Sequence, residues 1–204
     1  MKKTLIALLC MAGTLMAQTP APSQTLPGNV PGITMQSSLS WYDIDAGVRT
    51  YLILLMANTM ELSAEIQGDG TELPTPEQQF DLMQKVVDAT PLDSLSGEYL
   101  EFIKEANKIN TKIIDTLKAE KPTDVKGVVA VSARFDGELN KLYAKYPQAA
   151  RYFSKDAQMS ITLMLMRETE IQRVSQQAFM AGKTPAEINK TVIEHLRRVA
   201  ADQQ

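Results

Sequence analysis

The sequence has almost none of the side chains that most metal and redox sites require. Its 204 residues include one cysteine, Cys10, and one histidine, His195. Zinc sites of the usual kinds need several Cys or His ligands, and thiol chemistry needs a reactive Cys. The paired Glu-x-x-His motifs of di-iron bundles and the glycine-rich phosphate loops are also missing. We therefore predict no metal, no cofactor and no catalytic residue, although a catalytic triad, which forms in space and not in sequence, stays an open alternative.

An excess of positive charge is missing as well. The chain has 21 Lys and Arg against 24 Asp and Glu, a formal charge of −3. If Lys2 and Lys3 are removed with an N-terminal signal peptide, the balance becomes 19 basic against 24 acidic residues. Nucleic acids and anionic membranes are bound largely through clustered basic side chains. We therefore expect no nucleic-acid partner.

Apolar runs long enough to cross a bilayer are scarce. The most apolar internal run, 51–57, lies between Arg49 and Glu61. A membrane-spanning helix needs about 20 consecutive apolar residues, so this run is predicted to belong to a core helix. No membrane span is expected once an N-terminal signal peptide has been cleaved.

The first residues have the layout of a secretory signal peptide. Lys2 and Lys3 precede the uncharged apolar segment 4–16, and Ala17 offers a small residue before Gln18. The sequence predicts a signal peptide over 1–17 and export by a bacterial cell, either to the periplasm or to the medium. Cys10 would be removed with the signal peptide. The mature chain would then have no disulfide and would depend on its hydrophobic core.

Residues 18–38 contain Pro20, Pro22, Pro27 and Pro31 among small and polar residues. Such a composition offers little to bury and is typical of a flexible or extended leader. The remaining residues, 39–204, have the length of a single domain.

Nearly all of this domain follows a helical period. Six helices are expected, over 43–66, 76–90, 96–119, 123–145, 147–181 with a possible break near Ser154, and 184 to the C-terminus. Glycine, proline and Thr-Pro capping signals separate them. The clearest apolar stripe is that of the third helix: Tyr99, Phe102, Ile103, Ala106, Ile109, Ile113 and Leu117. The prediction is an all-α, elongated antiparallel bundle, because a continuous helix over 154–181 would be about 42 Å long.

Glu168 is the most unusual residue of the expected helices. It lies seven residues after Ile161, between Leu165 and Ile171, and so within an apolar arc. A carboxylate buried there must be paired, hydrogen-bonded or protonated, and perturbed acids are common at functional sites. The more ordinary alternative is that the arc opens at this level and Glu168 reaches solvent or a surface Lys or Arg.

Three further residues are candidates for contact with a ligand. His195 lies on the flank of the apolar face of the last helix, where it either donates to a neighbouring oxygen or contacts a ligand. Tyr99 and Tyr143 could line a pocket between helices together with Glu168. Each of the two tyrosines also fits a core position.

The segment Thr75-Pro76-Glu77-Gln78-Gln79 resembles the Leu-Thr-x-x-Gln motif of small helical periplasmic chaperones of the Spy type, and Thr184-Pro185-Ala186-Glu187 resembles it more loosely. The resemblance implies a helical envelope protein that binds unfolded chains. It covers nine residues, Pro74 and Lys183 replace the leucine, and helix capping accounts for the same residues. The family is therefore not assigned.

Two functions follow from these features. The first is non-enzymatic binding of another protein or envelope component, as a chaperone-like or interaction protein, through amphipathic helices and adaptable methionines, of which the chain has 11. The second is a small-ligand or enzymatic pocket between helices around Glu168. The sequence leaves the oligomeric state open.

Overall fold

The regular structure of the protein is entirely helical in the residues that its computed structural model describes, 40–67 and 76–203. The elements are the 3₁₀ turn η1 (Trp41–Asp43) and the α-helices α2 (Ala46–Gln67), α3 (Pro76–Ala89), α4 (Gly97–Glu120), α5 (Val125–Ala133), α6 (Asp136–Lys145), α7 (Pro147–Phe153), α8 (Lys155–Glu168), α9 (Ile171–Met180) and α10 (Pro185–Ala201). The predicted all-α class is confirmed. The segments predicted as signal peptide (1–17) and leader (18–38) lie outside the described residues.

The expected number of six helices is wrong, because two of the expected helices are divided. The segment 123–145 is interrupted at Arg134 and Phe135, whose amide groups donate to carbonyls three residues back, at 3.1 Å each, instead of four. These bonds tighten the chain into a turn, after which α6 begins. No glycine or proline stands at the turn itself, so its position had no local signal.

The expected helix over 147–181 is divided twice. The predicted break at Ser154 is present, where ψ is 155° and the backbone is extended. A second break follows Thr169, because Glu170 has the left-handed φ of 53°. A left-handed conformation costs a non-glycine residue about 1–2 kcal/mol, so tertiary contacts must favour this turn. One such contact is the hydrogen bond between the Thr169 carbonyl and His195 of α10.

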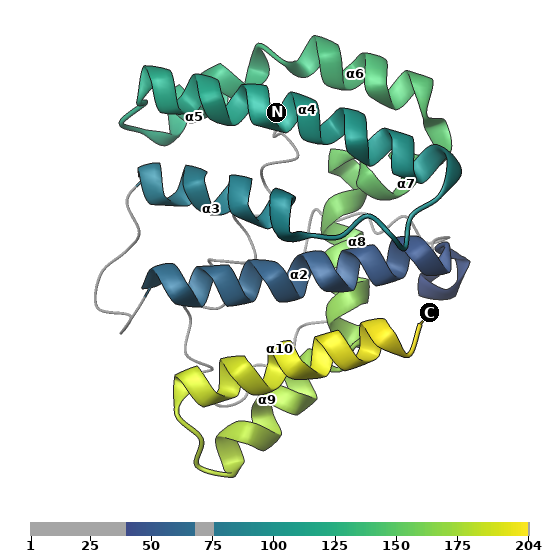
Figure 1. Ribbon diagram of the computed structural model, residues 1–204, viewed down its shortest axis with the longest axis vertical. Coiled ribbons are helices and arrows are strands. Elements are labelled where there is room, and N and C mark those ends of the chain that lie inside the picture. The colour runs from purple at the N-terminus through teal and green to yellow at the C-terminus, as the bar shows by residue number, and fades with distance from the viewer. Residues whose placement is uncertain (1–39, 68–75, 204) are drawn as a thin grey trace, which may run out of the picture.

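The helices form an antiparallel stack (Figure 1). Helix α2 packs between α3 and α10. Helix α4 contacts α3 as well as α5 and α6. Helices α7 and α8 run across this stack, so that α8 touches both η1 and α9. The longest axis of the molecule is the direction in which helices are stacked (Figure 1), and not the direction of one long helix.

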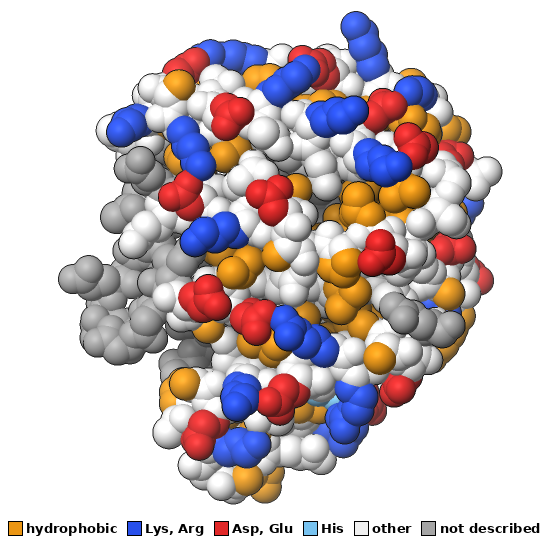
Figure 2. Space-filling model, viewed as in Figure 1, with side chains coloured by type: hydrophobic (Ala, Val, Ile, Leu, Met, Phe, Trp, Pro, Cys, Tyr) orange, Lys and Arg blue, Asp and Glu red, His pale blue; other side chains and the backbone are white. Residues whose placement is uncertain are grey.

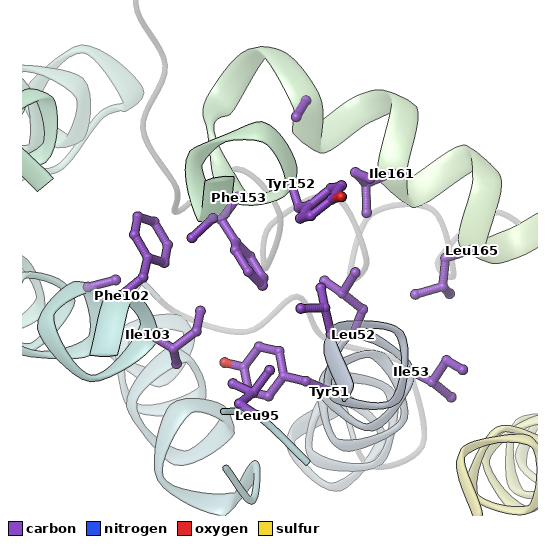
Figure 3. Packing of buried hydrophobic residues seen from close by; sticks show 14 of the residues in the cluster. Tyr51, Leu52, Ile53, Leu95, Phe102, Ile103, Tyr152, Phe153, Ile161 and Leu165 are labelled. Atoms are coloured by element: carbon purple, nitrogen blue, oxygen red, sulfur yellow. The ribbon is translucent and has the colours of Figure 1, made fainter. Parts of the chain in front are cut away.

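The core is richest in aromatic side chains where α2, α4 and α7 meet (Figure 3). The rings of Phe102 and Phe153 are stacked with their centroids 5.5 Å apart, and Tyr51 meets Phe153 edge-on at 6.1 Å. Burial raises the pKa of the Tyr51 hydroxyl well above its usual range. Both the area buried and the ring geometry stabilise the contact between these helices.

The apolar run of α2 belongs to this core, as predicted. Tyr51, Leu52, Ile53 and Ala57 are all buried against neighbouring helices. Among the helices of the described ranges, none has both the length and the apolar character that a membrane crossing requires.

Candidate functional site

Glu168 ends α8 and points toward η1. Its carboxylate accepts a hydrogen bond from the Tyr42 hydroxyl at 3.3 Å and forms an ion pair with Arg167 at 2.7 Å. The Glu168 side chain is 19% exposed, whereas that of Arg167 is 71% exposed. Glu168 thus has features of both alternatives predicted from the sequence. Its side chain is largely buried, and its carboxylate is bonded to a tyrosine and to an exposed arginine.

We expect Glu168→Gln to change the free energy of unfolding by less than about 1 kcal/mol. The amide oxygen of Gln can still accept from Tyr42, and an ion pair with an exposed Arg contributes little. Urea unfolding of wild type and variant at one pH measures the difference, with Glu101→Gln as the control for an exposed pair with Lys104. A loss above about 2 kcal/mol would show instead that the Glu168 charge is needed by a buried partner.

His195 is held at the break between α8 and α9. Its Nε2 lies 2.7 Å from the Thr169 carbonyl oxygen and its Nδ1 lies 3.1 Å from Nη2 of Arg198. A carbonyl can only accept and a guanidinium can only donate. His195 therefore carries its proton on Nε2 and accepts on Nδ1 in this arrangement.

Tyr99 and Tyr143 belong to the aromatic part of the core. The Tyr99 ring lies 6.0 Å from that of Tyr152, and the Tyr143 ring is stacked on Phe102 at 6.1 Å. Burial, followed by the nearby Tyr152, raises the pKa of the Tyr99 hydroxyl. Both tyrosines are half-buried and contribute to packing between α4 and the helices α6 and α7.

A cleft of about 390 Å³ lies along the hairpin formed by α9 and α10. Its lining consists of Arg173, Val174, Gln177, Ala178, Ala181, Lys183, Thr191, His195 and Arg198. Of the four candidate residues of the sequence, His195 alone lines it. Glu168, Tyr99 and Tyr143 do not line this cleft. A pocket around Glu168 stays a prediction from the sequence.

Local signals in the sequence form the hairpin that carries the cleft. Helix α9 ends in a Schellman turn: Gly182, at φ 75°, donates to the Phe179 carbonyl, and Lys183 donates to the Ala178 carbonyl. Helix α10 then begins with the predicted capping box, in which Thr184 and Glu187 bind each other's backbone. This box is confirmed, and it fixes Lys183 directly beside the start of α10.

The lining of the cleft is basic. Arg173, Lys183 and Arg198 contribute three positive charges, and no carboxylate is part of the lining. Hydrogen bonds from Arg173 hold the pKa of the nearby Glu170 carboxyl below its usual range, so Glu170 is ionised and neutralises Arg173. The grouping of Arg173, Lys183 and Arg198 could not be predicted from the sequence, because the three positions follow no motif. Their only signal was the concentration of basic residues toward the C-terminus.

Within the described ranges, no cluster of three or more His, Cys, Asp or Glu side chains is arranged to hold a metal ion. Comparison of the chain with models of known protein families, with curated proteins and with solved structures found no match in any of the three.

Proposed function

We propose that this protein is an exported, non-enzymatic helical bundle that binds segments of other proteins through the tip of the α9–α10 hairpin. The observation that carries the proposal is the exposure of two adjacent large apolar side chains at the end of α9. Phe179 is 61% exposed and Met180 is 78% exposed. Hydrophobic side chains lie at the lower tip of the molecule in Figure 2, where Figure 1 places the turn between α9 and α10.

Charge narrows the class of partner. Of the chain's 21 basic and 24 acidic side chains, five basic and two acidic ones lie in 171–201. The hairpin is therefore positive on a chain that is negative overall. An exposed aromatic and a methionine beside basic side chains suit a protein segment with apolar and acidic residues, because aromatic and Met side chains supply contact area and opposite charges steer the encounter.

Export of the protein stays part of the proposal on the strength of the sequence at 1–17. In an envelope or extracellular setting, a segment of this kind would belong to another exported protein or to an unfolded chain. The resemblance of two capping segments to periplasmic chaperone motifs is compatible with either.

Peptide binding tests the proposal directly. The probe is a fluorescent 15-residue peptide that alternates Leu and Phe with Glu, and the measurement is fluorescence anisotropy at a fixed salt concentration. The double variant Phe179→Ala, Met180→Ala is expected to weaken binding at least about 10-fold, since the few anchor residues at the centre of an interface account for most of the binding energy.

A matched control is the double variant Val129→Ala, Leu163→Ala, which removes two exposed apolar side chains from α5 and α8. It should bind the acidic peptide as wild type does. The proposal is wrong if both double variants lose affinity equally, or if a peptide with Lys in place of Glu binds as tightly as the acidic one.

A further inference from the structure

We infer that the cleft between α9 and α10 binds a small organic anion, with its carboxylate or phosphate group between Lys183 and Arg198 and its apolar part over Val174 and Ala178. The cleft extends along the flank of the hairpin from the turn, where Ala181 and Lys183 line it, to Arg198. Phe179 and Met180 do not line it, so this inference does not depend on the proposed function. Its volume of about 390 Å³ is at the small end of the usual range for small-molecule sites, about 300–1,000 Å³.

Two of the three basic side chains in the cleft have neutral hydrogen-bond acceptors. Lys183 Nζ donates to the Thr191 hydroxyl at 2.8 Å, and Arg198 donates to His195 at 3.1 Å. In the part of the chain that the structure describes, neither of them has a carboxylate within ion-pair distance. An oxyanion would add a Coulomb attraction that a hydroxyl or an imidazole acceptor lacks. Arg198 has five N–H donors, so it can bind an oxyanion and keep its bond to His195.

Arg173 differs from these two, because its guanidinium is bound to the Glu170 carboxylate. The other acids near the cleft are engaged as well. The Glu187 carboxylate accepts from the backbone and side chain of Thr184, which lowers the pKa of Glu187. Glu194 lies 4.0 Å from Lys190. The charge of Lys183 also lowers the pKa of Glu187, although the two form no ion pair. Within the described residues, Lys183 and Arg198 are therefore the cations of the cleft that no carboxylate pairs at short range.

His195 positions one of these groups. Its ring is anchored through Nε2 to the Thr169 carbonyl, and its Nδ1 faces Arg198. Since Nδ1 is an acceptor in this arrangement, His195 does not bind the anion but keeps the guanidinium at the edge of the cleft.

The remaining lining explains why the anion should be organic. Ala178 is buried, Val174 is half-buried, and Ala181 closes the lining at the end of α9. These side chains offer no hydrogen bonds, so they suit a compact apolar group attached to the oxyanion. Inorganic phosphate would leave this part of the cleft in water.

Nuclear magnetic resonance of the full chain can test the inference, because the protein has a single histidine and its ring protons give unambiguous signals inside the cleft. Phenyl phosphate, benzoate, inorganic phosphate and benzyl alcohol are titrated at constant pH and ionic strength. Phenyl phosphate or benzoate should shift the His195 signals in a saturable manner, and whichever binds more tightly identifies the source of the oxyanion. Benzyl alcohol should give no saturable shift, and inorganic phosphate should bind at least about 10-fold more weakly than phenyl phosphate.

Variants then assign the binding to the two basic groups. The double variant Lys183→Gln, Arg198→Gln should weaken binding at least about 10-fold, measured by ligand-observed resonance because Arg198 also affects the His195 signals. The control variant Lys190→Gln removes an exposed charge from α10, the helix that contains Arg198. It should bind the ligand as wild type does. If the double variant fails to fold, Lys183→Gln alone should still weaken binding about threefold or more.

Absence of a saturable shift with either aromatic anion would overturn the inference. Equal binding by wild type and the folded double variant would do the same. Equal affinity for phenyl phosphate and inorganic phosphate would contradict the contact of the ligand's apolar part with Val174 and Ala178.

Discussion

Replacing Gly47 with alanine is expected to lower the free energy of unfolding by about 3 kcal/mol. Gly47 lies in the first turn of α2, where it approaches the loop that joins α3 to α4. A Cβ atom at this position would lie 1.9 Å from the Ser94 carbonyl oxygen and 3.0 Å from its carbon. The obstacle is backbone and not a flexible side chain, so either α2 or the loop must move.

Movement of the loop is costly because Leu95, the next residue, is buried and its amide group is bonded to the Leu92 carbonyl at 2.9 Å. Helix propensity acts in the opposite direction, since alanine is favoured over glycine in a helix by about 0.5–1 kcal/mol. The sign of the result therefore reports whether close packing or propensity dominates. Urea unfolding followed by circular dichroism provides the measurement.

Gly137→Ala serves as the control for Gly47→Ala. Gly137 lies in α6, and a Cβ there would meet nothing within 4 Å. Propensity alone should then stabilise this variant by about 0.5–1 kcal/mol. If Gly47→Ala also proved stabilising, the close approach of α2 to Ser94 would be wrong.

Phe102→Ala is expected to cost about 3–5 kcal/mol, the largest effect among the substitutions considered. The Phe102 side chain is fully buried at 0% exposure and contacts the rings of Tyr143, Tyr146 and Phe153. Its removal leaves a cavity at the junction of α4, α6 and α7 and also removes three ring contacts. The free energy of unfolding and the near-ultraviolet circular dichroism of the tyrosines both report the change.

Phe179→Ala removes the same side chain from the surface of the hairpin, where it is 61% exposed. Its stability should stay within about 0.5 kcal/mol of wild type, as for most surface substitutions. Comparable losses at 102 and 179 would contradict either the burial of Phe102 or the exposure of Phe179. The pair of variants also separates folding from binding, because only position 179 is proposed to contact a partner.

The apolar pattern of the third expected helix correctly predicted the buried face of α4. Phe102, Ile103, Ala106, Ile109, Ile113 and Leu117 are all buried, as the helical period indicated. The local signals for helix ends were also correct. Gly182 lies in the turn that ends α9, and Thr184 caps the start of α10. Each of these features depends on residues within one or two turns of one another, which a sequence displays directly.

The candidate residues show the limit of this approach. Glu168 was singled out by its position in an apolar arc, but its partner Tyr42 is 126 residues away in the sequence. His195 was a candidate in its own right, but the cleft that contains it was not foreseen. An apolar period identifies the buried face of a helix but not the helix that covers it.

By itself, the sequence determined the all-α class, the end of α9 at Gly182, the start of α10 at Thr184 and most of the core of α4, because these are set by hydrogen bonds and side-chain spacing over a few residues. The tertiary structure decided where the long helices break and which charges meet. The left-handed turn at Glu170 separates α9 from α8 and is favoured by the bond between Thr169 and His195 of α10. Arg173 of α9 shares one cleft with Lys183 and Arg198 only because α9 packs against α10, a contact that the helical period of neither helix shows.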